Sequence, residues 1–247
     1  GSSNLKIGRQ KLNTPLAGAD DARMLPNLFE AAVYSNTGIE NTTLIAAHVT
    51  KETTGTFSNI YDDSSTIGIY SGYGLGTTLA QSGTFKDMGV VALGAGNNTD
   101  GVTAGAIIYK GIDNVTLQAW DYYAHDILNA IYLQADMKWN CMLTDAAKPF
   151  ASVQYIGQSD IGDKVGGNVD SSYWGAKVGA TVGALTGYVA YSQTGDEGIL
   201  SPWGGMPAFT QGMVTRHQFF ADTDAWKVAG TYKVNADLKA SAYYTEF

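Results

Sequence analysis

Residues 130–141 read AIYLQADMKWNC, a stretch in which apolar and polar side chains alternate. One face of the extended chain holds Ile131, Leu133, Ala135, Met137, Trp139 and Cys141, and the other holds Tyr132, Gln134, Asp136, Lys138 and Asn140. A period of two is the mark of a β-strand whose two faces meet different surroundings. Because the alternation continues through the whole stretch, it predicts a strand and excludes a helix there.

The same alternation recurs along most of the chain. It is strong in 172–182, 185–192, 226–234 and 238–245, and weaker in 43–51, 102–110, 115–123 and 151–158. Two further strand-like runs, LKIGRQ (5–10) and FEAAVY (29–34), stand near the start. Together with 130–141 these segments predict an all-β chain of eleven strands.

The length and the aromatic placement of these strands indicate a membrane. They run to about ten residues, whereas strands of globular proteins have a mode of about five or six. About ten residues tilted by roughly 45° cross a bilayer. Apolar faces rich in Ala, Val and Leu, with Trp or Tyr near their ends, are typical of a lipid-facing band. A soluble β-sandwich alternates equally well with its apolar faces inward, but these two features favour a transmembrane antiparallel β-barrel.

The expected connections alternate between long and short, as they do in outer-membrane barrels. They are 11–27, 36–41, 52–100, 111–113, 124–127, 142–147, 158–170, 183–184, 194–223 and 235–237. The alternation holds only if the apolar run MGVVALGA (88–95) is no wall strand. We therefore assign this run to the insert 52–100, where one arrangement for it is a local hairpin with 66–70.

Eleven strands do not close a bacterial single-chain barrel, which uses an even number. Unpaired edges in lipid cost several kcal/mol for each unsatisfied backbone group. We therefore expect residues 1–247 to form one barrel domain that is incomplete at both ends.

Composition and motifs exclude several other classes of protein. A formal charge of −8 argues against nucleic acid as a partner. A single cysteine excludes an internal disulfide and a Cys-based zinc site. The three histidines lie far apart in sequence, and neither HExxH nor GxSxG occurs. We expect no enzyme activity, no cofactor and no bound metal.

Several segments, taken in order, resemble the OprD-like family of outer-membrane porins. They are LKIGRQ (5–10) with TP (14–15), DDARMLPNLFEA (20–31), VTLQAWDYYAHDILNAIYLQADMKW (115–139), LTGYVAYSQTGDEG (185–198), PWGGMPAFT (202–210), AWKVAGTYKV (225–234) and LKASAYY (238–244). The resemblance covers nearly the whole chain and is weakest in 52–100. No single motif is highly specific, and the match depends on the order and spacing of all of them.

The resemblance implies a barrel of about eighteen strands, with about four missing in front and three behind. It implies that 11–27 is the third loop, which folds inward and constricts the lumen, and that 52–100 is an extracellular insert. The implied function is diffusion of small hydrophilic solutes, anionic or zwitterionic and bearing carboxylates, across the bacterial outer membrane. The implied partners are these solutes, membrane lipid and lipopolysaccharide. Monomer and homotrimer both remain open.

Lysines on the polar faces are the first set of candidate site residues. Strand parity places Lys138, Lys177, Lys227, Lys233 and Lys239 there, and Lys6 joins them from the first strand. Charged rows lining a lumen set the selectivity of a channel. The resemblance implies that these lysines form the basic ladder of the family, a row of cationic side chains on the barrel wall that faces the third loop. Lys stands here where Arg is commoner in the family. Lysines would bind carboxylates as point charges, without the bidentate geometry of Arg. The alternative, for any one of them, is a lysine that is simply solvated.

The constriction supplies the second set. The resemblance implies an acidic patch on the third loop, for which Asp20 and Asp21 are the candidates, with Arg23 lining the pore or tying the loop to the wall. An exposed turn is the alternative for the two acids. Arg9 shares parity with Leu5 and Ile7, so a regular strand would point it at lipid. We expect either that the strand ends at Gly8 or that a bulge turns Arg9 inward, with Glu30 as its partner.

Two other functions remain in view. Long extracellular loops suit a surface adhesin or receptor, and alternation alone is compatible with a soluble β-sandwich binding domain. Solubility without detergent would identify the sandwich, and the lack of stepwise conductance in planar bilayers would exclude the porin.

Overall fold

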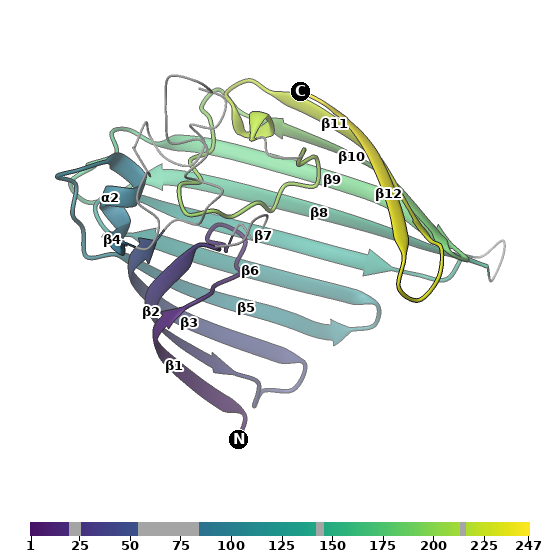
Figure 1. Cartoon of the computed structure of the whole chain (residues 1–247), viewed down its shortest axis with the longest axis horizontal. Helices are drawn as coiled ribbons and strands as arrows, with labels where there is room; N and C mark the ends of the chain where they lie inside the picture. The colour runs from purple at the N-terminus through teal and green to yellow at the C-terminus, as the bar shows by residue number, and fades with distance from the viewer. Residues whose placement is uncertain (20–25, 54–83, 142–145, 213–215) are drawn as a thin grey trace.

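A computed structural model describes residues 1–19, 26–53, 84–141, 146–212 and 216–247. One curved antiparallel sheet dominates it, with the strands in chain order and each bonded to the next (Figure 1). Eleven strands make up this path, β1-β2-β3-β5-β6-β7-β8-β9-β10-β11-β12, and the short β4 pairs with β3 beside it. The predicted all-β class and the eleven wall strands are confirmed.

The observed strands extend most of the predicted ones by a few residues. They are β1 (Ser3–Gln10), β2 (Leu28–Asn36), β3 (Thr42–Thr53), β4 (Lys86–Asp87), β5 (Val102–Ile112), β6 (Val115–Ala124), β7 (Leu128–Lys138), β8 (Ala147–Asp160), β9 (Asp170–Val182), β10 (Leu185–Thr194), β11 (Asp224–Lys233) and β12 (Lys239–Glu246). β7 ends at Lys138, so Trp139 and Cys141 follow the strand instead of continuing it.

The connections gather by length at the two ends of the sheet. The long ones, 11–27, 54–101, 161–169 and 195–223, lie at one end together with the short 125–127, and we call this the long-loop end. The connections at the other end, the short-turn end, are shorter than these four: 37–41, 113–114, 139–146, 183–184 and 234–238. Asn41, Asn114 and Gly183 adopt positive φ of 54°, 63° and 57° there, a conformation that Asn and Gly adopt most readily.

The outer face of the sheet is apolar and exposed. Leu133, Val153 and Val178 are 43%, 55% and 58% exposed on it. Toward the long-loop end, Tyr191 packs between two tryptophans, with ring centroids 5.3 Å from Trp174 and 4.5 Å from Trp226. The Tyr191 hydroxyl donates to Asp224 Oδ1 at 2.7 Å. Apolar ring bodies with hydrogen-bonded tips are typical of a membrane–water interface.

The buried core lies on the inner, concave face, where the long connections fold over the strands (Figure 1). Leu16, Met88, Val91 and Trp203 come from three connections and are 1–3% exposed. They belong to one cluster with wall residues such as Tyr122. The sheet therefore carries apolar residues on both faces near the long-loop end. Those on the outer face are exposed, as lipid-facing residues are, and those on the inner face pack against the long connections.

The predicted hairpin at 88–95 is wrong, because Met88–Leu93 is a short helix, α2. Asp87 caps it by accepting from the Gly89 N–H at 2.8 Å. Met88, Val91 and Ala92, spaced three and four apart, bury one side of it. The suggested partner segment, 66–70, lies outside the described residues. No helix in the described part of the chain is long and apolar enough to cross a membrane.

Candidate functional site

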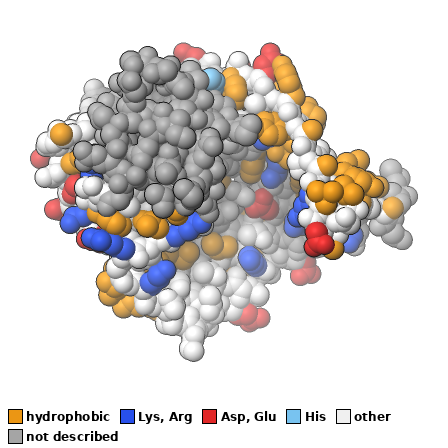
Figure 2. Space-filling model, in the orientation of Figure 1, with side chains coloured by type: hydrophobic (Ala, Val, Ile, Leu, Met, Phe, Trp, Pro, Cys, Tyr) orange, Lys and Arg blue, Asp and Glu red, His pale blue; other side chains and the backbone are white. Residues whose placement is uncertain are grey.

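All six lysines predicted for the lumen lie on the inner face. Residues in register across a sheet share a face, and Lys6 stands opposite Val33, which packs against the inner core. Four others follow the parity of buried inner residues on their own strands: Lys138 on β7, Lys177 on β9, and Lys227 and Lys233 on β11. Lys239 on β12 stands in register with Lys233 and therefore shares its face. Figure 2 shows Lys and Arg side chains scattered over this concave face.

Two of these lysines form a pair. Lys177 and Lys227 both stand in register with Ala190 of β10, the strand between theirs. Ala190 is 1% exposed, so the wall between the two lysines is covered. Asp136 lies two strands from Lys177 in the same row, through Ser152, whose hydroxyl donates to it at 2.7 Å.

The connection 195–223 covers the pair. The Lys177 ammonium lies 4.3 Å from the ring centroid of Phe209. Lys227 donates to the Gln211 carbonyl at 2.5 Å and lies 4.4 Å from the ring centroid of Tyr243 on β12. Ser192 Oγ and Thr210 Oγ1, 2.6 Å apart, fix the connection to the wall beside Lys177. The two lysines thus lie on the part of the inner wall that the connection 195–223 covers.

A hollow of about 810 Å³ opens on the inner face between this pair and the short-turn end. Its charged lining residues are Lys110, Lys138, Lys148, Lys177 and Asp136. Sequence reasoning missed Lys110 and Lys148. Lys110 follows an inner parity that is otherwise apolar (Val102, Ala104, Ala106, Ile108), so the polar-face rule passed over it. Lys148 falls between the predicted turn 142–147 and the predicted strand 151–158, whereas β8 already begins at Ala147.

The remaining lysines of the predicted ladder are set apart. Lys233 and Lys239 stand directly opposite each other at the short-turn end. Like charges directly opposite each other in a sheet repel. Lys6 lies on the edge strand β1, far along the sheet from the others.

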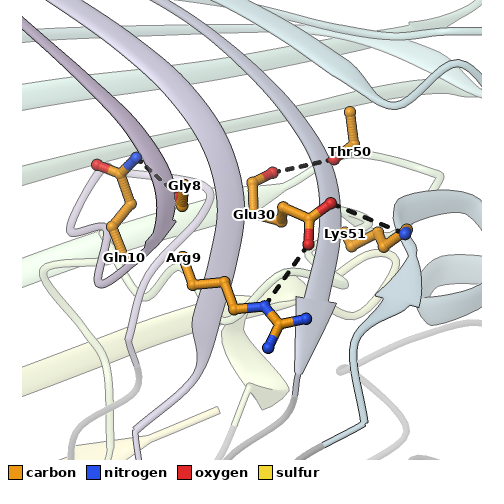
Figure 3. Close-up of polar contacts among 6 residues, drawn as sticks. All are labelled: Gly8, Arg9, Gln10, Glu30, Thr50 and Lys51. Carbon is orange, nitrogen blue, oxygen red and sulfur yellow. Dashed lines mark hydrogen bonds and ion pairs between the residues drawn. The ribbon is translucent and has the colours of Figure 1, made fainter.

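Arg9 and Glu30 come together as expected, but on the outer face. Arg9 Nε lies 3.6 Å from Glu30 Oε2, and Lys51 Nζ lies 3.8 Å from Glu30 Oε1 (Figure 3). The three residues are cross-strand neighbours. Phe29, which precedes Glu30 on β2, is fully buried on the inner face, and Gln10 leaves β1 on the other side from Arg9 in Figure 3.

This placement differs from the expectation that Arg9 and Glu30 line the constriction. The strand does not end at Gly8, although Gly8 has a φ of 116°, and the β1–β2 register continues unbroken through Gln10. The register shift lies instead in β3, beside Glu30. The inner face of β2 is apolar because loops pack on it, so polar parity does not mark the lumen side there.

Asp20, Asp21 and Arg23 lie outside the described residues. The neighbouring part of their loop, up to Ala19, is anchored inside the sheet. The Gly18 N–H donates to the Trp203 carbonyl at 2.9 Å, and the Asn27 amide donates to the Gly18 carbonyl at 3.1 Å. Among the described residues, no three His, Cys, Asp or Glu side chains gather as metal ligands would.

Comparison with known proteins relates this arrangement to a family. Residues 1–236 match the family described as outer membrane porin, OprD family. No curated protein matches. Three similar solved structures come from Pseudomonas aeruginosa. OccK9 (OpdG) has a TM-score of 0.78 at 18% identity, with 99% of this chain and 57% of that chain covered.

The second, OccK2 (OpdF) in complex with glucuronate, has a TM-score of 0.78 at 18% identity, covering 99% of this chain and 61% of that one. The third, OpdK with vanillate, has a TM-score of 0.74 at 20% identity, covering 94% and 55%. The chain thus spans between 55% and 61% of the length of these three neighbours.

Proposed function

Because this chain belongs to the OprD family of outer membrane porins, we propose that it forms a wall of a channel through which small hydrophilic solutes diffuse across the bacterial outer membrane. Family and fold indicate a channel rather than an enzyme. In such barrels the long loops are extracellular and the short turns periplasmic, which gives the orientation of the sheet.

We further propose that the preferred solutes are anionic or zwitterionic and carry carboxylates. The observation that carries this proposal is the row in which Lys177 and Lys227 flank Ala190 on the inner wall. Lysine ammonium groups attract carboxylates as point charges. Two of the structural neighbours are described with glucuronate and with vanillate, which are carboxylates.

The constriction in this proposal has two parts. The loop 11–27 and the connection 195–223 fold onto the inner wall and contact each other at Gly18 and Trp203. Asp20, Asp21 and Arg23 would stand on the first of these, facing the lysines of the wall. The insert 52–100 would lie on the extracellular side, and membrane lipid, including lipopolysaccharide, would surround the outer face.

The test is the ion selectivity of the channel carrying this sequence in planar bilayers. We expect the double variant Lys177→Glu/Lys227→Glu to shift the reversal potential in a salt gradient toward cation selectivity. A change of about 1 kcal/mol in the interaction with a passing anion at roughly 10 Å corresponds to about a fivefold change in permeability ratio.

Lys51→Glu, a single charge reversal, is the outer-face control, because Lys51 lies on the outer face. Its reversal potential should equal that of the parent. An unchanged reversal potential in the double variant would exclude the lysine pair as the selectivity element, and the lack of stepwise conductance in the parent would exclude the porin function.

A further inference from the structure

A cluster of charges on the outer face has no part in the proposed passage of solutes. It consists of Arg9, Glu30 and Lys51, which we call the outer charge cluster. Their side chains are 67%, 35% and 48% exposed. All three lie near the long-loop ends of β1, β2 and β3.

The level of the outer charge cluster marks the upper edge of the apolar band. Ile7, two residues before Arg9 on the same face, is 73% exposed, and Leu5 is 61% exposed. A charge costs about 2–4 kcal/mol at the bilayer midplane and about 0–1 kcal/mol near the interface. Exposed apolar residues followed by charges therefore place the cluster at the headgroup level, on the extracellular side if the long loops are extracellular.

Two cations share one carboxylate in this cluster, which leaves a net charge of +1. Both pairs are wide, at 3.6 Å and 3.8 Å, so Glu30 holds the two cations beside each other without a close hydrogen bond. The Arg9 guanidinium also lies 4.3 Å from the ring centroid of Phe85, which fixes its position. In Figure 3 its Nε faces Glu30 and its terminal nitrogens lie beyond.

We infer that the outer charge cluster binds a phosphate group of a lipid in the outer leaflet. Among the described residues, the ion pair of the Arg9 guanidinium is made through Nε, and its terminal N–H groups match the geometry of a phosphate. A neighbouring ammonium adds a second charge-assisted contact. The bound lipid would place its acyl chains along the exposed apolar side chains below, Ile7 and Leu5. The inference rests on the outer-membrane location and on the orientation of the loops, and not on which solute the lumen prefers.

The experiment is native mass spectrometry of the detergent-solubilised channel with lipid A and with the same lipid after removal of its phosphates. We expect the parent to retain phosphorylated lipid A in preference to the dephosphorylated form. Equal retention of both forms would overturn the inference, and this comparison needs no variant.

Variants locate the site. We expect Arg9→Gln/Lys51→Gln to lower the retained fraction of lipid A by roughly fivefold or more, as for the loss of two charge-assisted contacts. Glu30→Gln removes the competing carboxylate and should raise retention. Retention like that of the parent in the double variant, or a loss in Glu30→Gln, would overturn the inference.

The matched control removes two lysines from the inner face, Lys138→Gln/Lys148→Gln. It changes the net charge of the protein by the same amount as the double variant does. Lipid retention should equal that of the parent, and an equal loss would show that total charge, not the outer charge cluster, holds the lipid. Heat-dependent mobility in gel electrophoresis verifies that each variant is folded.

Discussion

Among single residues, Lys177 has the best-defined surroundings on the inner wall. Phe209 covers its ammonium at 4.3 Å from the ring centroid, and Tyr188 lies farther away at 5.7 Å. A cation–π contact of this kind contributes about 0.5–1 kcal/mol where it is exposed and about 2 kcal/mol where it is desolvated. A carboxylate that approached Lys177 would compete with the ring, so we expect Phe209 to limit how strongly this lysine holds a solute.

Replacement of Phe209 tests this role. In Phe209→Ala the Lys177 ammonium loses its cover, and we expect glucuronate to block the chloride current at a concentration roughly two- to fivefold lower, which matches about 0.5–1 kcal/mol. Phe220→Ala is the control, since Phe220 is exposed and packs against His217 instead. Equal block in Phe209→Ala and the parent would show that the ring does not limit access to Lys177.

Among the elements, three long connections meet inside the sheet at Trp203. Trp203, 2% exposed, donates from Nε1 to the Met88 carbonyl of α2 at 3.1 Å and accepts from the Gly18 N–H at 2.9 Å. A Cβ on Gly205 would lie 2.2 Å from the Pro15 carbonyl oxygen. The first and the last long connection therefore meet backbone to backbone, which only a glycine at 205 allows.

A methyl group at this junction should separate the two connections. We expect Gly205→Ala to lower the free energy of unfolding by about 1–3 kcal/mol, as for overpacking of a close contact, and to increase open-channel current noise. Urea titration in detergent and single-channel recording measure the two effects. Gly230→Ala on β11 is the control, because its Cβ would meet nothing within 4 Å. If both variants unfold alike, the junction does not stabilise the fold.

In the molecule as a whole, the two faces of one sheet have different surroundings. The outer face carries the apolar band and the outer charge cluster, and the inner face carries the loops and the lysines. Neighbouring residues on one strand therefore meet opposite surroundings. Leu133 is 43% exposed on the outer face, whereas the Gln134 amide, facing inward, donates to Asp136 Oδ2 at 2.7 Å.

Arginine at these two neighbouring positions should have unequal effects. We expect Leu133→Arg, near the middle of β7, to lower the free energy of folding into lipid vesicles by about 2–4 kcal/mol. Gln134→Arg places the same charge on the wet face beside Asp136 and should cost far less. Guanidinium titration of vesicle-inserted protein measures both. Equal costs would contradict the assignment of the outer face to lipid.

The sequence by itself determined the features that follow from local patterns, above all the strands, in which side chains alternate between two faces. The alternation in 130–141 and its counterparts predicted nine wall strands, two strand-like runs at 5–10 and 29–34 predicted the other two, and the alternation of loop lengths excluded 88–95 from the wall. It also placed Lys138, Lys177 and Lys227 on the inner face. These predictions succeeded because a strand exposes successive side chains to opposite sides whatever it packs against.

Tertiary structure alone decided what depends on contacts between distant segments. The sequence does not show that loops fold onto β2 and make its inner face apolar, so the side of Glu30 was not predictable from polarity. Parity with Leu5 and Ile7 did indicate the outer side of Arg9, and the expected departure from a regular strand is absent. It does not show that Lys177 and Lys227, fifty residues apart, share the neighbour Ala190. Register across strands and the packing of long connections arise from the whole sheet, because each is set by residues far away along the chain.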